Sequence, residues 1–292
     1  MKRLIVAVLT LSAGAAAQAG EAVDKTLDVR ANGLVRIENV RGRIAVDGWD
    51  RDQVQVVGTL DDRAKAFVFE TSGATTTVRV ETPDNLNRGE GSNLVIHVPK
   101  TSRVRADVVS AELHLTDLAG GVDGKTVSGD ILAAEVGDRI ELATVSGDVR
   151  LTRGSGPTRF ATVSGDIEAD ADSAEIEIST VSGRARVASS ARVRELTMHS
   201  VSGDLEVGAS LADGAHVRGS TTSGDIRLAI NPDASVVVEL KTTAGGGVRN
   251  TLTKDKPNRG ISGAEALDLT LGSGQGGVEL TTVSGRVELA PL

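Results

Sequence analysis

The sequence predicts an all-β protein, a parallel β-solenoid (β-helix-like) of stacked rungs of about 18–21 residues, preceded by an N-terminal β-rich cap. Three observations predict it: a short phrase that returns at a fixed spacing, alternation of apolar and polar residues around that phrase, and an aromatic content of only 1%. So few aromatic side chains suit a thin aliphatic core better than a thick globular one.

The repeated phrase is the strongest signal. TVSGDI begins at Thr126 and returns as TVSGDV, TVSGDI and TVSGRA at steps of 18 residues. Later copies start at Ser200, Thr221, Thr242 and Thr282, and one step back from the first lies VSAEL, from Val109 to Leu113. In an antiparallel meander, successive strands run in opposite directions and have no reason to repeat in phase, so the spacing favours the solenoid over a sandwich or barrel. The signature glycines are predicted at tight turns: Gly129, Gly147, Gly165, Gly183, Gly203, Gly224 and Gly285.

Each copy also alternates like a half-buried strand. Val145, Gly147 and Val149 are predicted to share the buried face, so that stacking at about 4.8 Å places Val on Val and Ile on Ile in continuous ladders. A second short strand precedes each phrase, as at Ile140 and Leu142, and its parity is shifted by one. The shift implies a bend between the two strands.

Three regions follow from these patterns. Residues 1–19 are predicted to be a signal peptide, residues 20–105 an N-terminal β-rich cap with the first rungs, and residues 106–292 the repeats. In the cap, Val40–Ile44 (VRGRI) resembles the signature, and Lys254–Gly260 is the best candidate for a protruding loop. A cap is expected because the end of an uncovered solenoid exposes sheet edges.

The expected localisation rests on the first residues. Lys2 and Arg3 precede an apolar run that is shorter than the roughly 20 residues needed to cross a bilayer, and small residues lead to Ala19, where cleavage is expected. The mature chain is therefore expected to be exported, most simply to the periplasm, with the cell surface or secretion as alternatives and without stable membrane insertion. The chain has no cysteine for disulfides or lipid attachment.

Charge argues against nucleic acid as a partner. The net charge of −8 becomes −10 once Lys2 and Arg3 are removed, and the acidic residues are spread along the chain. Phosphate backbones require a basic face.

An aspartate column is the weak candidate for an outer-face cation or ligand ladder. Like charges at rung spacing must be solvated, paired or bridged, and Arg184 could relieve the repulsion. A solvated outer face is the simpler interpretation, so no metal site and no cofactor are predicted. The column comprises Asp130, Asp148, Asp166, Asp204 and Asp225.

The same repetition argues against catalysis. A nucleophilic serine needs one distinguished copy beside a base, whereas the signature serines are many and equivalent and the four histidines are scattered. Polysaccharide-active solenoids use aromatic platforms for sugars, but Trp49 is the single tryptophan and is expected to pack in the cap. We therefore predict no catalytic residues.

The repeats in register, with LVRIENVRGRIAV from Leu34 and LVIHVPKTSRV from Leu94, resemble the bacterial adhesin-like family of β-strand-repeat proteins called domain of unknown function 4097. The resemblance covers the chain from about Leu27 to Leu289. It implies the fold and the label adhesin, and it brings no established catalytic residues.

Together these patterns predict an exported, non-enzymatic, adhesin-like interaction module of the bacterial cell envelope. Its partner would be an unidentified envelope or surface protein or glycan. The alternatives are a periplasmic structural or regulatory envelope protein and, less favoured, a polysaccharide-active enzyme.

Overall fold

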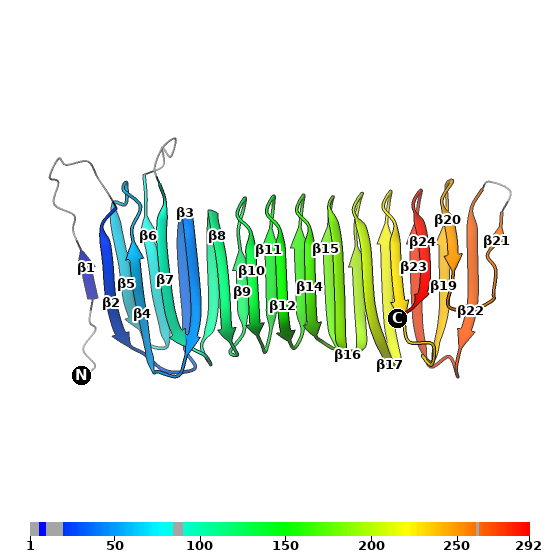
Figure 1. Cartoon of the computed structure of the whole chain (residues 1–292), viewed down its shortest axis with the longest axis horizontal. Helices are drawn as coiled ribbons and strands as arrows, with labels where there is room; N and C mark the ends of the chain where they lie inside the picture. The colour runs from blue at the N-terminus through cyan, green and yellow to red at the C-terminus, as the bar shows by residue number, and fades with distance from the viewer. Residues whose placement is uncertain (1–5, 10–19, 84–89, 261–262) are drawn as a thin grey trace. The chain divides into compact units, whose positions relative to one another are not determined.

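The computed structural model describes residues 6–9, 20–83, 90–260 and 263–292, and the regular elements in these ranges are all β-strands (Figure 1). The chain divides into two compact units, Met1–Gly147 and Asp148–Leu292. Each is built mainly of parallel rungs, which confirms the predicted solenoid. Within the described ranges there is no helix long and apolar enough to span a membrane.

The regular rungs of the first unit each contain a strand before the signature turn and a strand after it. On one face β9 pairs in parallel with β8, and β11 with β9; on the other, β10 pairs with β8. Each pair joins residues 18 positions apart, such as Ile131 with Leu113, so equivalent side chains stack on one another. The strands are β8 (Arg103–Leu118), β9 (Val122–Lys125), β10 (Ile131–Val136) and β11 (Ile140–Thr144).

A cap of strands covers the first regular rung. β3 passes through VRGRI and lies directly on β8, with Ile44 paired to Leu113, so this phrase does occupy a rung. β6 and β7 pair in parallel with the other edge of β3, and beyond them β5, β4 and β2 run antiparallel, which ends the parallel stack. The cap strands are β2 (Ala22–Asp28), β3 (Leu34–Trp49), β4 (Gln53–Thr59), β5 (Ala66–Ser72), β6 (Thr75–Glu81) and β7 (Ser92–Pro99).

The predicted signal peptide, residues 1–19, falls mostly outside the described residues. Of this segment the structure describes only β1 (Val6–Leu9), whose backbone pairs antiparallel with residues 67–70 of β5. Cleavage after Ala19 stays a prediction.

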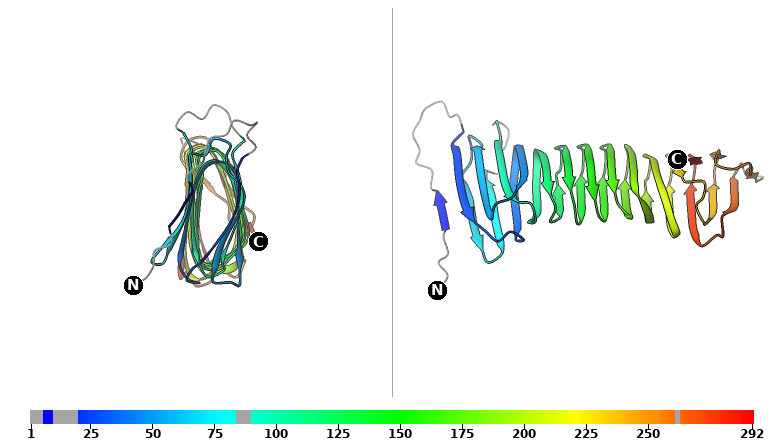
Figure 2. Two further views of the ribbon diagram at one scale, coloured as in Figure 1. Left: turned by 90° about the vertical axis from the view of Figure 1, so that its left-hand side faces the viewer. Right: turned by 60° about the horizontal axis from the view of Figure 1, so that its bottom comes forward.

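The core of each unit is thin and aliphatic. In the first unit, Ile44, Leu113 and Ile131 form one column with no exposed surface. In the second unit, Leu205 and Ile226 form a similar column and are at most 1% exposed. The end-on view in Figure 2 shows the strands of the two faces lying close together, and the buried side chains accordingly form a narrow layer. Burial of apolar surface in this narrow layer is the main stabilising contribution that the rungs can make.

The prediction that the signature valines are buried is wrong. In most copies the buried positions are the Thr before the valine and the Gly two residues after it, such as Thr144 and Gly147. The chain bends at the Val–Ser pair, so the inward parity changes there and the valine points outward at the corner. The exposed valines, each 41–48% accessible, are Val109, Val127, Val145, Val163, Val181, Val201 and Val283.

The second unit continues the same rung design. Its parallel pairs join residues 18 apart as far as Ile167 with Ala185, then 20 apart for Ala185 with Leu205. The extra residues are absorbed by a bulge between Ser189 and Arg192 of β16. The strands are β12 (Val149–Ser155), β13 (Thr158–Thr162), β14 (Ile167–Asp172), β15 (Glu175–Thr180), β16 (Arg184–His199), β17 (Asp204–Thr221), β18 (Ile226–Ile230), β19 (Val236–Thr242), β20 (Gly247–Asn250), β21 (Asn258–Arg259), β22 (Glu265–Leu271), β23 (Gly276–Thr282) and β24 (Arg286–Pro291).

The last rungs are not stacked in chain order. β23 pairs in parallel with both β17 and β19, and β24 with both β18 and β20, so residues 276–291 form a rung between two earlier ones. In Figure 1 the red strands accordingly lie between the yellow and orange strands. β22 then pairs antiparallel with β19 and covers its outer edge. The expected protruding loop lies in this part and ends in β21, which pairs with β22.

A short crossing connection makes this insertion possible. The chain leaves β22 on one side of β19 and enters β23 on the other, passing Ser235 just before β19. The backbone N–H groups of Ser273 and Gln275 donate to Ser235 Oγ at 3.1 and 3.4 Å, and Gly276 N–H donates to the Ser235 carbonyl at 3.0 Å. Ser235 therefore fixes the crossing.

Candidate functional site

The signature turn is closed by its threonine. In the first unit the N–H of Gly129 donates to Thr126 Oγ1 at 3.0 Å, and the same bond joins Gly147 to Thr144. Because each threonine is buried, this side chain satisfies an N–H that would otherwise lack a partner. In the second unit the bond recurs for Gly165 with Thr162, Gly203 with Ser200, Gly224 with Thr221 and Gly285 with Thr282.

The signature glycines are required by the close approach of successive rungs. A Cβ at Gly147 would lie 2.0 Å from the carbonyl oxygen of Gly129, and one at Gly224 would lie 2.0 Å from that of Gly203. Neither glycine has positive φ. Gly183 differs, since it has a φ of 107° and precedes Arg184 in place of aspartate. Thus the absent side chain, more than backbone freedom, explains this column.

The aspartate column connects neighbouring rungs. Asp148 Oδ1 accepts the N–H of Asp166 at 2.9 Å, and Asp166 Oδ1 accepts the N–H of Arg184 at 2.7 Å. Asp204 Oδ1 likewise accepts from Asp225 N–H at 3.0 Å. These charge-assisted bonds give the short carboxylate a structural role at the start of each strand.

The remaining residue of the predicted cation ladder is Asp130, in the first unit. Asp130 lies exposed at the equivalent position in the first unit. In the residues that the structure describes, no group of three or more His, Cys, Asp or Glu side chains is arranged to hold a metal ion.

Arginine occupies the aspartate column at two rungs of the second unit. The register places Arg184 beside Asp204 and, because of the inserted rung, Arg286 beside Asp225. The N–H of Arg286 donates to Asp225 Oδ1 at 2.7 Å, so its backbone keeps the ladder although its side chain has changed.

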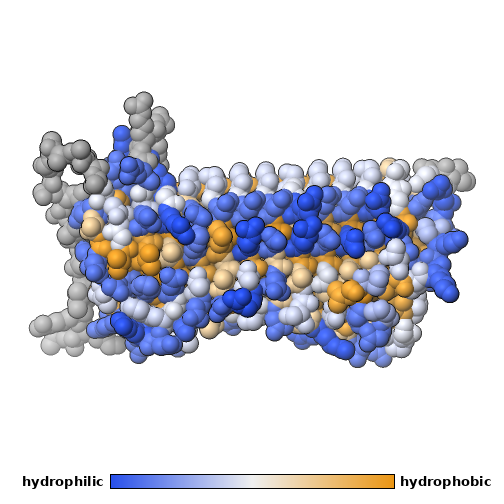
Figure 3. Space-filling view, viewed as in Figure 1, coloured by the Kyte–Doolittle hydropathy of each residue, from blue (hydrophilic) through white to orange (hydrophobic). Residues whose placement is uncertain are grey.

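A second charged column, two residues further along each strand, alternates in sign. Arg150 pairs with Glu168 at 3.1 Å and Arg186 with Glu206 at 3.1 Å. Figure 3 shows hydrophilic side chains gathered in a band across the strands. The alternation is complete only in the spatial order of the strands, because the inserted rung places Glu288 between two arginines that follow each other in the chain. In spatial order the column comprises Arg150, Glu168, Arg186, Glu206, Arg227, Glu288 and Arg249.

The outer face of the second unit is hollowed over these columns. One hollow of about 190 Å³ is lined by charged residues of both columns and by the edges of Leu205 and Ile226. A neighbouring hollow of about 130 Å³ lies over Asp148, Asp166 and the residues around them. Arg184 lines both.

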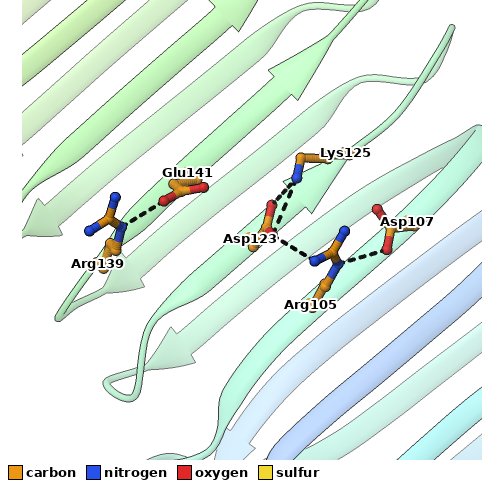
Figure 4. A network of polar contacts seen from close by, with 6 residues as sticks. All are labelled: Arg105, Asp107, Asp123, Lys125, Arg139 and Glu141. Atoms are coloured by element: carbon orange, nitrogen blue, oxygen red, sulfur yellow. Dashed lines mark hydrogen bonds and ion pairs between the residues drawn. The ribbon is translucent and has the colours of Figure 1, made fainter.

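The first unit carries a network of polar contacts between charged side chains in and beside β8, β9 and β11 (Figure 4). Arg105 Nε donates to Asp107 at 3.0 Å, which raises the pKa of Arg105, and Lys125 Nζ lies 3.0 Å from Asp123. A hydrogen bond from Arg139 lowers the pKa of Glu141. The pairs lie along and between strands, where they offset like-charge repulsion.

The structure also contains a buried ion pair that the repeats do not reveal. Arg41 of the VRGRI turn contacts Asp61 through two nitrogens, at 2.6 and 3.0 Å, and the Asp61 side chain is only 1% exposed. The hydrogen bond from Arg41 lowers the pKa of Asp61, and Asp61 N–H donates to Ser92 Oγ. The sequence feature that could have indicated this pair is Arg41 itself, which stands where the other copies of the signature have serine.

Trp49 is engaged by its neighbours. Its indole N–H donates to the Gln53 carbonyl at 2.8 Å, its ring stacks on His97 with centroids 5.1 Å apart, and the Arg51 guanidinium lies 4.9 Å from its centroid. This arrangement agrees with the packing role expected for Trp49 in the cap.

These features define a β-solenoid with repeated polar columns held by hydrogen bonds between rungs. The chain belongs to the Toastrack family, domain of unknown function DUF4097, whose profile matches residues 35–290. This membership confirms the resemblance found in the sequence.

Solved structures similar to this chain include two from bacteria. One is a candidate cell adhesion protein from Clostridium sporogenes, with 8% identity, a TM-score of 0.24, and coverage of 93% of this chain and 100% of that one. The other is a candidate adhesin from Bacteroides fragilis, with 10% identity, a TM-score of 0.46, and coverage of 92% and 97%. No curated protein matches the chain.

Proposed function

We propose that this chain is an exported, non-enzymatic, adhesin-like interaction module of the bacterial cell envelope, whose partner is a protein or glycan of the envelope or surface. The observation that carries the proposal is the repeated outer face. Equivalent side chains recur at most rungs, and the hydrogen bonds of Asp and Thr fix the turn edge that bears them. A rigid, repeated surface suits recognition because little ordering is needed on binding.

The serine column supports a structural role for its hydroxyls. Ser128 Oγ lies 3.1 Å from Ser110 Oγ, and Ser182 Oγ donates to the Val163 carbonyl at 3.1 Å. His199 Nδ1 does lie 2.8 Å from Ser220 Oγ, but among the described residues no carboxylate bonds His199 to orient it. A nucleophilic serine requires such an oriented base, so this contact favours binding over hydrolysis.

Protease accessibility on cells tests the proposal. A specific protease site inserted between Asp255 and Lys256, in an exposed loop, avoids the resistance expected of a stacked core. An adhesin-like module that acts at the cell surface should be cleaved on intact cells. Cleavage only after osmotic lysis would favour the periplasmic structural or regulatory alternative and overturn the adhesin-like role.

A control variant lacking residues 1–19 and carrying the same site should be cut only after complete lysis. If the full-length chain carrying the site behaved like this control, export itself would be contradicted.

A further inference from the structure

The strongest unexplained feature is a run of four charges on consecutive rungs of the second unit. In spatial order the aspartate column reads Arg184, Asp204, Asp225 and Arg286, positive at both ends and negative in the middle. The run exists only because the C-terminal rung is inserted after β18. It borders the hollow of about 190 Å³.

The two arginines lie at the two ends of this run. Among the described residues, neither the Arg184 nor the Arg286 guanidinium forms an ion pair, and both residues are exposed. The neighbouring column is internally paired: Arg227 lies 3.8 Å from Glu206, and Glu288 has its own arginine partner. The charges left for a ligand are therefore two guanidinium groups with two carboxylates between them.

The carboxylates are only partly used. Asp204 Oδ1 accepts the N–H of Asp225, and Asp225 Oδ1 accepts the N–H of Arg286. Among the described residues, the second oxygen of each carboxylate accepts no hydrogen bond, and both side chains are exposed. A ligand cation placed between them would relieve the repulsion of two like charges on adjacent strands.

We propose that this hollow binds an extended segment of a partner protein that carries an acidic, a basic and an acidic residue at alternate positions. Three rung steps separate Arg184 from Arg286, about 14 Å at the strand spacing. Residues i and i+4 of an extended peptide lie about 13 Å apart on one side, with residue i+2 between them. The acidic residues would meet the arginines and the basic residue the two aspartates.

Charge complementarity selects this partner over the others. A neutral glycan would leave both guanidinium groups unpaired, and a polyanionic one would meet Asp204 and Asp225. The inference rests on the proposed function, because it names the ligand class that an interaction module of this kind would take.

Titration of the purified protein with the capped pentapeptide Glu-Ala-Lys-Ala-Glu tests the proposal. We expect saturable binding, followed by NMR, with a dissociation constant in roughly the millimolar range, since exposed ion pairs are individually weak. Binding should weaken as salt is added. The charge-reversed peptide Lys-Ala-Glu-Ala-Lys should bind at least about tenfold more weakly.

The matched variants use the repeat itself. Arg184→Asp with Arg286→Asp restores the residue found in other rungs, and we expect binding about tenfold weaker or undetectable. Lys254→Asp with Lys256→Asp makes the same change of charge in an exposed loop and should leave binding unchanged. Because Gly183 has positive φ beside Arg184, the single variant Arg286→Asp provides a second test with that turn intact.

Unchanged binding in both arginine variants, or equal binding of the reversed peptide, would overturn the proposed ligand. Absence of binding to the unmodified protein would do the same. Neither result bears on cleavage at the cell surface, so failure of the ligand proposal and failure of the envelope function are distinguishable.

Discussion

At the scale of single residues, the stacking of the rungs depends on the absent side chain of the signature glycines as well as on the buried aliphatic side chains. The repeated phrase correctly indicated turns, but it could not show that the glycine Cα lies against the carbonyl of the preceding rung. Nor could alternation locate the bend, because valine is equally compatible with either side of it. Hence the sequence identified the column of Gly147 and misplaced that of Val145.

Gly224→Ala should destabilise the second unit by about 1–3 kcal/mol, because its Cβ would collide with the Gly203 carbonyl. Urea denaturation measures the change. Gly277→Ala is the control, since a Cβ there would meet only a His216 nitrogen, at 4.0 Å. Equal midpoints for the two variants would contradict the close approach of the rungs.

Asp61→Asn should cost the first unit about 1–3 kcal/mol, because it removes the buried carboxylate charge that accepts two hydrogen bonds from Arg41. The variant should also lose part of the acid dependence. Arg41 lowers the folded-state pKa of Asp61 from 3.8, so its stabilisation is present above that value and disappears as the pH falls through the lower, folded-state pKa. Unfolding free energies of both proteins between neutral and acidic pH provide the measurement. A parallel loss in both would exclude Asp61 as the cause.

At the scale of elements, pairing order departs from chain order at both ends. β3 lies between β8 and the later strand β7 in the first unit, and β23 and β24 lie inside the second. Periodicity predicts which segments are rungs but contains no information on which rung neighbours which.

Paired cysteines can test the inserted rung, because the chain has none of its own. Thr222→Cys with Val283→Cys joins exposed corner positions of adjacent strands, about 4.8 Å apart, and should form a disulfide on oxidation. Thr222→Cys with Thr243→Cys would span two strand spacings and should stay reduced. Mobility on non-reducing gels distinguishes them. A disulfide in the second pair but not in the first would contradict the inserted rung and favour strands stacked in chain order.

At the scale of the whole molecule, the sequence predicted the class of fold, the thin core and the family. It did not predict the opposed charges of the candidate site, because Arg286 and Asp225 are 61 residues apart and become neighbours only through the insertion. The last part of the sign alternation, where Glu288 lies between Arg227 and Arg249, has the same origin. Charge neighbours on a solenoid therefore follow topology more closely than they follow the repeat.

The inserted rung also sets an order of events. During synthesis, β19 and β20 emerge before the strands that must lie beneath them, so their inner edges have no final partner until residues 276–291 have been made. The second unit cannot close progressively from one end to the other, as a simple stack could. Its outermost strands, β19 and β20, complete their pairing only after β23 and β24 have been made. Until then their unpaired edges can pair with another molecule.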